Sequence, residues 1–156
     1  VTVNGQFRSY NNYSETGNRL ILTVFARDIA KRADLSDEEV NSNPNYIFLN
    51  GFLCKKPVYR STPFGREITD LLIAVNRAYN KSDYIPCIAW GRNARYSSSL
   101  NVGDNIKIWG RIQSREYQKK ISEDESVTKT AYEISVSKME VSSEKKSEEE
   151  SDADII

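Results

Sequence analysis

Five segments of the chain alternate apolar and polar side chains with the two-residue period of a β-strand, and turn-forming residues separate them. These segments are Tyr46–Cys54, Arg66–Arg77, Tyr84–Trp90, Asn105–Tyr117 and Thr130–Val141. The only good helix candidate among them is the connection Gly91–Leu100, between the third and fourth strands. The sequence therefore predicts an all-β domain over residues 46–141.

Five strands with one helix after the third strand is the pattern of the oligonucleotide-binding barrel, or OB-fold. This fold is a partly open, five-stranded Greek-key barrel that binds oligonucleotides on its second and third strands and on its hairpin loops. Because one fold serves many functions, the pattern predicts an architecture but not yet a ligand.

The first 29 residues repeat part of this domain. We interpret residues 1–29 as a β-hairpin with a polar turn over residues 9–18, forming the C-terminal part of a first OB-fold that is truncated at its N-terminus. The alternative is that the two hairpins look alike only because hairpins generally do. At a constant offset of 105, Val1, Val3, Gly5, Phe7 and Ser9 match Ile106, Ile108, Gly110, Ile112 and Ser114; after a loop seven residues longer in the second copy, Leu22 and Val24 match Ile134 and Val136.

Two further segments flank the main domain. Residues 30–45 read as a linker that holds a short helix capped by Ser36. Residues 142–156 form a charged, low-complexity tail that we expect to be disordered.

The net charge of zero hides two regions of opposite sign. Residues 46–121 carry 13 Lys and Arg against 5 Asp and Glu, whereas residues 140–156 carry 2 against 7. A basic domain with an acidic tail predicts a polyanionic ligand for the domain.

Several function classes are disfavoured by the residues that the sequence lacks. It contains no histidine, which removes the commonest general base and makes a zinc site improbable, and it has no phosphate-binding glycine loop or nucleophile elbow. Cys54 and Cys87 are too few for a disulfide scaffold and are expected to be buried. We therefore expect no catalysis, no metal and no cofactor. With neither a secretory signal nor a membrane-spanning apolar run, we expect a cytoplasmic protein.

Residues 84–120 interleave aromatic side chains with arginines and lysines on strand-like segments. A base of a single strand can stack on an aromatic ring while its phosphate attracts a guanidinium or ammonium group, and neither contact needs a particular base. The pattern therefore favours a surface for single-stranded nucleic acid.

Most of the main domain resembles the bacterial single-stranded DNA-binding protein family. The resemblance runs in one unbroken order through residues 46–53 (YIFLNGFL), 56–65 (KPVYRSTPFG), 72–77 (LIAVNR), 83–91 (DYIPCIAWG), 101–104 (NVGD) and 109–115 (WGRIQSR). It implies sequence-independent binding that protects and presents single-stranded DNA during replication, recombination and repair. It also implies a bacterial, nucleoid-associated homo-oligomer, here of a variety with two barrels in one chain.

The resemblance also implies which residues contact DNA, with Tyr79, Tyr84, Trp90 and Tyr117 as the stacking aromatics. Alternation agrees for β-strand 84–90, because it puts one set of side chains on each face. One face carries Tyr84, Pro86, Ile88 and Trp90, and the smaller apolar face, with Ile85, Cys87 and Ala89, is the expected core side. The full set of expected contacts is Tyr59, Arg60, Phe64, Arg66, Arg77, Tyr79, Tyr84, Trp90, Arg92, Arg95, Trp109, Arg111, Arg115, Tyr117 and Lys119.

Individual members of this set have other interpretations. Trp90 could instead lie in the barrel core, Tyr79 could be a solvated loop residue, and any one arginine could be an ordinary surface charge. Alternation places Arg111, Arg115 and Tyr117 in a polar stripe opposite the apolar side of their strand. Trp109 shares the outward face and could contact either DNA or another subunit.

The acidic C-terminus resembles the partner-binding tail of the family. Asp152, Asp154, Ile155 and Ile156 would recruit replication or repair proteins, although the usual Pro-Phe tip is absent. The alternative is a tail that only increases solubility.

Two other functions remain open at this point. The chain could be an RNA-binding OB module, since stacking does not distinguish the two sugars. It could also be an OB-fold that serves mainly as a protein-assembly module.

Overall fold

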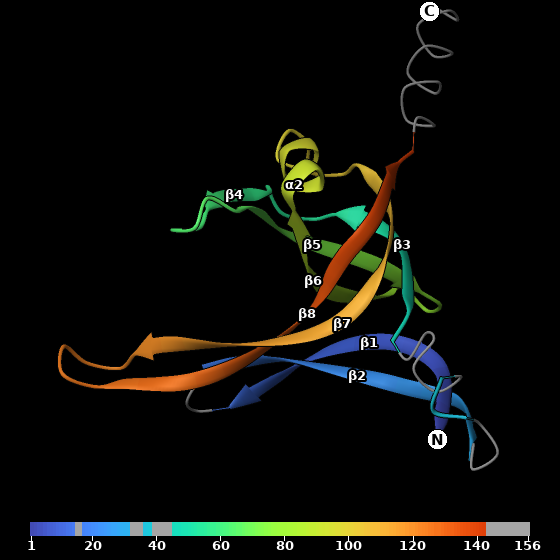
Figure 1. The fold of residues 1–156 in the computed structure, drawn as a ribbon. Coiled ribbons are helices and arrows are strands. Elements are labelled where there is room, and N and C mark those ends of the chain that lie inside the picture. Colours follow the sequence, from blue (N-terminus) through green and yellow to red (C-terminus); the bar gives the residue numbers. More distant parts are fainter. Residues whose placement is uncertain (15–16, 32–35, 39–44, 143–156) are drawn as a thin grey trace, which may run out of the picture.

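The computed structural model describes residues 1–14, 17–31, 36–38 and 45–142 (Figure 1). Eight strands are assigned within these residues, and the helix Gly91–Ser97 (α2) lies between β6 and β7. The strands are Thr2–Ser14 (β1), Gly17–Ala30 (β2), Ile47–Leu53 (β3), Val58–Ser61 (β4), Glu67–Arg77 (β5), Lys81–Trp90 (β6), Asn105–Lys120 (β7) and Ser126–Val141 (β8).

The main domain is a closed five-stranded barrel, which confirms the predicted all-β OB-fold. Its sheet runs in the order β3-β7-β8-β6-β5-β4. A further pairing between β3 and β5 closes β3, β7, β8, β6 and β5 into a ring, and β4 pairs with β5 outside that ring. All pairings are antiparallel except that between β6 and β8, which is parallel and covers Cys87 and Ile88. This single parallel contact is what makes the topology a Greek key rather than a meander.

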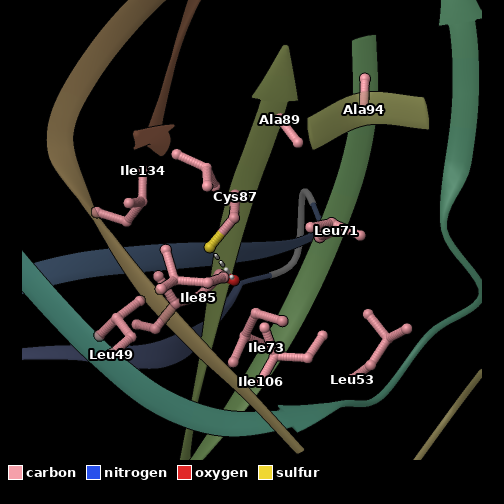
Figure 2. Packing of buried hydrophobic residues seen from close by; sticks show 12 residues of the cluster. Leu49, Leu53, Leu71, Ile73, Ile85, Cys87, Ala89, Ala94, Ile106 and Ile134 are labelled. Carbon is pink, nitrogen blue, oxygen red and sulfur yellow. Dashed lines mark hydrogen bonds between the residues drawn. The ribbon is translucent and has the colours of Figure 1, made fainter. Parts of the chain in front are cut away.

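The barrel core consists of aliphatic side chains from every barrel strand, because alternate residues of each strand point inward. Figure 2 shows Ile85 and Cys87 of β6 among side chains from the neighbouring strands, with Ala94 of α2 beside Leu71 and Ala89. Helix α2 is further held by Thr69, whose hydroxyl donates to the Ala94 carbonyl at 2.7 Å. The buried apolar cluster is Leu49, Leu53, Leu71, Ile73, Ile85, Cys87, Ala89, Ala94, Ile106, Ile108, Ile134 and Val136.

The observed elements differ from the predicted ones at several places. β7 continues to Lys120 rather than Tyr117, β8 begins at Ser126 rather than Thr130, and α2 ends at Ser97 rather than Leu100. Strand β4 was not predicted, because its four residues are all exposed and carry no alternation of burial. β6 begins at Lys81 rather than Tyr84, and the polar segment 9–18 continues both hairpin strands up to Ser14 and from Gly17. Among the linker residues that the structure describes, Asp37 and Glu38 are assigned as helix, where the sequence predicts a short helix after Ser36; most of the linker and the tail residues 143–156 lie outside the described residues.

The β1–β2 hairpin has the same strand register as the β7–β8 hairpin. Every residue pair of β1 and β2 corresponds to a pair of β7 and β8 when 105 is added on the first strand and 110 on the second. The correspondence includes a bulge at the same place, between Asn4 and Gly5 in one hairpin and between Trp109 and Gly110 in the other. The hairpins thus share a detailed geometry and not only a pattern of side chains.

This register corrects one detail of the repeat. Phe7 pairs with Val24 and its counterpart Ile112 pairs with Ile134, so Val24, and not Leu22, corresponds to Ile134. The second loop is therefore longer by 110 − 105 = 5 residues rather than seven. The prediction was wrong because the apolar pattern of a strand repeats every two residues and does not distinguish a register from one shifted by two.

Hairpin β1–β2 lies against the end of the barrel away from α2 (Figure 1). Phe7 and Leu22 pack against the buried cluster, and Ser9 is 6% exposed. By contrast, residues 114–130 of the β7–β8 hairpin are exposed on both faces and extend away from the barrel as an arm (Figure 1). We call this segment the β7–β8 arm.

We expect Gly110→Ala to destabilise the barrel strongly. A Cβ atom at Gly110 would lie 2.1 Å from the carbonyl oxygen of Ser135 on the neighbouring strand, so the two strands would have to separate. The expected loss is about 1 to 3 kcal/mol in the free energy of unfolding, measured by urea denaturation. Ser137→Ala, an exposed change on the same strand as Ser135, serves as the control. Equal midpoints for Gly110→Ala and the unmodified chain would contradict the close approach.

Candidate nucleic-acid interface

Trp90 is the centre of a surface made by outward-facing side chains of five strands. Strand pairing places Trp90 beside Ile68, and it aligns Asp70 of β5, Ile88 of β6, Ser135 of β8 and Arg111 of β7 in one row. We call the outward side of β4, β5, β6, β8 and the barrel part of β7 the Trp90 face.

Two contacts hold the Trp90 ring in place. Its Nε1 donates a hydrogen bond to Ser135 Oγ at 3.2 Å, and the guanidinium carbon of Arg66 lies 5.5 Å from the ring centroid. This distance suits a cation–π contact. The ring is therefore a fixed aromatic platform with a cation above it.

Strand β6 is buried on both faces near this platform. Ile85, Cys87 and Ala89 point into the core, as predicted. Ile88 lies on the Trp90 face together with Trp90, also as predicted, but it is only 1% exposed. Outward side chains of a barrel normally diverge into solvent, so the burial of Ile88 indicates that larger neighbours cover this part of the face.

Acidic neighbours neutralise two of the predicted cations on this face. Arg60 Nε lies 3.1 Å from Asp70 Oδ2, and Arg115 Nε lies 2.8 Å from Glu133 Oε1. Glu133 is only 4% exposed and also accepts a hydrogen bond from Gln113. Arg111, in contrast, is exposed and has no ion-pair partner among the described residues. The available positive charge of the face is therefore at Arg66 and Arg111.

Two predicted aromatics lie at hairpin tips with almost their whole surface exposed. Phe64 is 96% exposed in the β4–β5 turn, where the amide of Gly65 donates to the Thr62 carbonyl at 2.9 Å. Tyr79 is 93% exposed in the β5–β6 turn, and both Tyr79 and Asn80 have left-handed backbones, with φ of 64° and 57°. Nearly free aromatic rings at two tips are available for contact with a ligand.

Four further predicted contacts differ in whether their side chains are available to a ligand. Tyr84 of β6 and Tyr117 of the β7–β8 arm are 42% and 40% exposed, and Lys119 is exposed on the same arm. Arg77 instead turns toward the barrel end, where its Nε lies 2.7 Å from Oδ2 of the buried Asp83, although the N–H direction does not meet hydrogen-bond geometry.

Tyr59 and Arg95 lie on the other side of the sheet, next to α2. Arg95 Nη1 lies 2.7 Å from Glu67 Oε2, and Glu67 has the same strand parity as Thr69, which bonds to α2. Desolvation and the Glu67 carboxylate raise the pKa of Tyr59. Arg92, in the first turn of α2, is exposed. The structure therefore does not bring Tyr59 or Arg95 together with Trp90.

Trp109 belongs to a separate aromatic cluster. Its ring centroid lies 5.1 Å from that of Phe48 at an interplanar angle of 44°, and Lys138 Nζ lies 4.8 Å from the Trp109 centroid. Phe48 and the nearby outward residue Phe52 of β3 are 46% and 42% exposed. We call Phe48, Trp109 and Lys138 the Trp109 cluster.

The cysteines and acids of the described residues do not form a metal centre. No group of three or more His, Cys, Asp or Glu there could hold a metal ion. Desolvation in the core raises the pKa of the Cys87 thiol, and partial burial raises that of Cys54. In the same ranges, no helix has the length and apolar character needed to cross a bilayer. The predicted tail contacts Asp152, Asp154, Ile155 and Ile156 lie outside the described residues.

The family described as the single-strand binding protein family matches residues 44–142, which is more than half of the chain. The chain belongs to this family. The match includes the whole barrel and the Trp90 face but not the β1–β2 hairpin. Membership in a family named for binding agrees with the expectation that the chain is not an enzyme.

Curated relatives carry the same description. A single-stranded DNA-binding protein from Clostridium tetani is 36% identical over 83 residues, covering 49% of this chain and 57% of its own length. Single-stranded DNA-binding protein 1 of Staphylococcus aureus (strain COL) is 35% identical over 81 residues, covering 47% and 48%. The chain thus spans about half the length of the curated relatives it matches.

A solved structure shows the same fold across the hairpin as well. It is a deletion variant of the single-stranded DNA binding protein from Thermus aquaticus, with a TM-score of 0.66 at 20% identity. The similarity covers 90% of this chain and 58% of the other.

Sequence reasoning missed the residues that position or neutralise the predicted contacts in this family member. Ser135 orients the Trp90 indole, while Asp70 and Glu133 pair with Arg60 and Arg115. Asn45 was also missed; its amide exchanges two hydrogen bonds with the backbone of Ile112 and so continues the β3–β7 ladder. The two-residue period of a strand could have placed Asp70 on the same face as Ile68. No local signal in the sequence, however, identifies which strands become neighbours, and so which arginine each carboxylate pairs with.

We expect Tyr79→Asn to raise the stability of the chain. A tyrosine in the left-handed region is strained, whereas asparagine tolerates it, so the free energy of unfolding should rise by up to about 1 kcal/mol. Thermal denaturation measures the change. Asn80→Tyr, the reverse exchange at the next left-handed residue, should lower the stability. A destabilised Tyr79→Asn would mean that the ring makes stabilising contacts, contrary to its 93% exposure.

Proposed function

We propose that the chain binds single-stranded DNA without base preference along the Trp90 face. The observation that carries the proposal is the fixed Trp90 ring, bonded to Ser135 at its edge and approached by the Arg66 guanidinium over the ring. A base can stack on such a ring whatever its identity, and a guanidinium can pair with the adjacent phosphate. Family membership and the names of the relatives support DNA as the polyanion.

The binding path extends from this platform to the exposed aromatics at its borders. Arg111 supplies unpaired positive charge across the barrel, and Tyr84 adds a half-exposed ring on the same strand as Trp90. Phe64, Tyr79 and the β7–β8 arm with Tyr117 and Lys119 add contacts that can follow a flexible strand. Arg95 and Tyr59 are left out of this path because they lie beside α2 and Arg95 is paired with Glu67.

The expected role is protection and presentation of single strands in replication, recombination and repair, with no chemical step. A ligand held by stacking and phosphate contacts is bound along its length and can be released to other proteins. An acidic tail that recruits such proteins remains part of the proposal.

The Trp109 cluster supports self-association of the chain. A tryptophan packed on a half-exposed phenylalanine, with Phe52 exposed on the same strand, offers the aromatic surface that is enriched in subunit interfaces. We propose that this cluster contacts a second copy. Light scattering at micromolar concentration that finds only monomer would remove this part of the proposal.

We further propose that β1–β2 is the last hairpin of a first OB-fold. Its register and bulge match those of β7–β8, and side chains with core parity remain exposed, namely Val3 at 44% and Val24 at 51%. In the barrel their counterparts Ile108 and Ile134 are fully buried. Further barrel strands would cover these residues.

We expect Trp90→Ala to weaken binding of an oligothymidine by about 5-fold to 150-fold, because one stacked base is worth about 1 to 3 kcal/mol. Fluorescence anisotropy of a labelled oligomer measures the affinity independently of the tryptophans. The control is Tyr96→Ala, which removes an exposed aromatic ring from α2 and should leave the affinity unchanged. An unchanged affinity for folded Trp90→Ala would exclude the Trp90 face.

The same assay decides the nature of the polyanion. Matched RNA and DNA oligomers in competition should favour DNA; preferential binding of RNA would instead make the chain an RNA-binding module. If neither the RNA nor the DNA oligomer shows salt-dependent binding, the chain would instead be a protein-assembly module.

We expect Arg111→Gln to reduce the salt dependence of binding. Each phosphate contact on a single strand contributes about −0.7 to the slope of log affinity against log salt concentration. Removing the unpaired Arg111 should therefore make the slope less negative by about 0.7. Arg95→Gln removes a charge that Glu67 already neutralises and should leave the slope as it is. If both variants shift the slope equally, the attraction comes from overall charge and not from the Trp90 face.

A further inference from the structure

Ser9 of the β1–β2 hairpin forms two hydrogen bonds with consecutive residues of β6. The Ser9 amide donates to Asp83 Oδ1 at 2.9 Å, and the Tyr84 amide donates to Ser9 Oγ at 2.6 Å. Both Ser9 and Asp83 are buried, at 6% and 1% exposed. One serine thus joins two segments that are more than seventy residues apart in the sequence.

The contact lies where β6 lacks a full neighbouring strand. β6 pairs with β5 along its whole length but with β8 only at Cys87 and Ile88. Near Tyr84 the other edge of β6 is therefore not paired with β8, and an amide that is removed from water there needs an acceptor. Ser9 Oγ supplies it.

Asp83 extends the contact to the neighbouring turn. While Oδ1 accepts from Ser9, Oδ2 lies 2.7 Å from Nε of Arg77. Arg77 pairs with Lys81, and these two residues bound the turn that carries Tyr79. The hairpin, Asp83 and Arg77 together hold the segment that presents both Tyr79 and Tyr84.

We propose that Ser9 and Asp83 are positioning residues for strand binding. They act through the β6 backbone, holding it so that the Tyr84 ring takes the orientation that stacks on a base, while neither side chain touches DNA. The β1–β2 hairpin thereby contributes to binding at a barrel that it does not belong to. This inference rests on the proposed function and deepens it.

The test is a double-mutant cycle on the affinity for an oligothymidine. Ser9→Ala removes the acceptor of the Tyr84 amide and should weaken binding by about threefold to tenfold, since a displaced ring loses part of its stacking. In a Tyr84→Ala background the same change should have no further effect, because the ring through which Ser9 acts is absent. Affinities are measured well below the melting temperature of each variant.

Ser99→Ala is the control of the same chemistry. Ser99 is an exposed serine just after α2, outside the proposed DNA path, and its hydroxyl donates to the Tyr96 carbonyl at 3.0 Å. Its replacement should leave the affinity unchanged. Equal losses from Ser9→Ala in both backgrounds would indicate general loosening and overturn the proposal, as would no loss in either. Failure of the unmodified chain to bind DNA would refute the proposed function itself.

A second measurement needs no variant. If the Ser9 contact favours the DNA-binding arrangement, DNA must in turn stabilise the contact, because coupling between two sites is reciprocal. Amide hydrogen exchange should therefore slow at Ser9 and Tyr84 when the oligothymidine binds, although Ser9 itself is not proposed to touch the ligand. Slowing confined to residues around Trp90, with Ser9 unaffected, would overturn the proposal.

Discussion

Closure of the sheet between β3 and β5 is the constraint on which the rest of the domain depends. Only two residue pairs make this closure, Phe52 with Ala74 and Leu53 with Ile73. Closing a sheet requires its strands to tilt and curve, so neighbouring side chains on β5, β6 and β8 cover one another. The burial of Ile88 and the bond from Trp90 to Ser135 follow from that curvature. The platform is thus part of the barrel wall and not a mobile loop.

The positive excess of the domain is less available than its composition suggests. Arg60, Arg95 and Arg115 each lie within ion-pair distance of a carboxylate. A pair between two exposed side chains, such as Arg60 with Asp70, adds little to stability, but all three pairs neutralise the charge of the arginine. Long-range attraction for a polyanion then comes from unpaired groups such as Arg111 and from the β7–β8 arm. Composition predicted that the ligand is negatively charged, whereas ion pairing decides where on the surface positive charge remains available to it.

The hairpin at the start of the chain is part of the same packed unit as the barrel. The family match begins at residue 44, yet Phe7 and Leu22 reach the barrel core and Ser9 bonds to β6. An edge that the barrel leaves open is covered by a segment outside the matched region. The boundaries of the family match and of the packed structural unit therefore differ here.

The sequence by itself determined the strands, the barrel class, the inward set on β6 and the repeat between the hairpins. These follow from local alternation, which depends only on the chain direction through each strand. It could not determine β4, the two-residue shift in the repeat, the partners of the arginines or the role of Ser9. Only the tertiary structure decided these, because they depend on which strands become neighbours, in which register, and that is set by contacts between residues far apart in the chain.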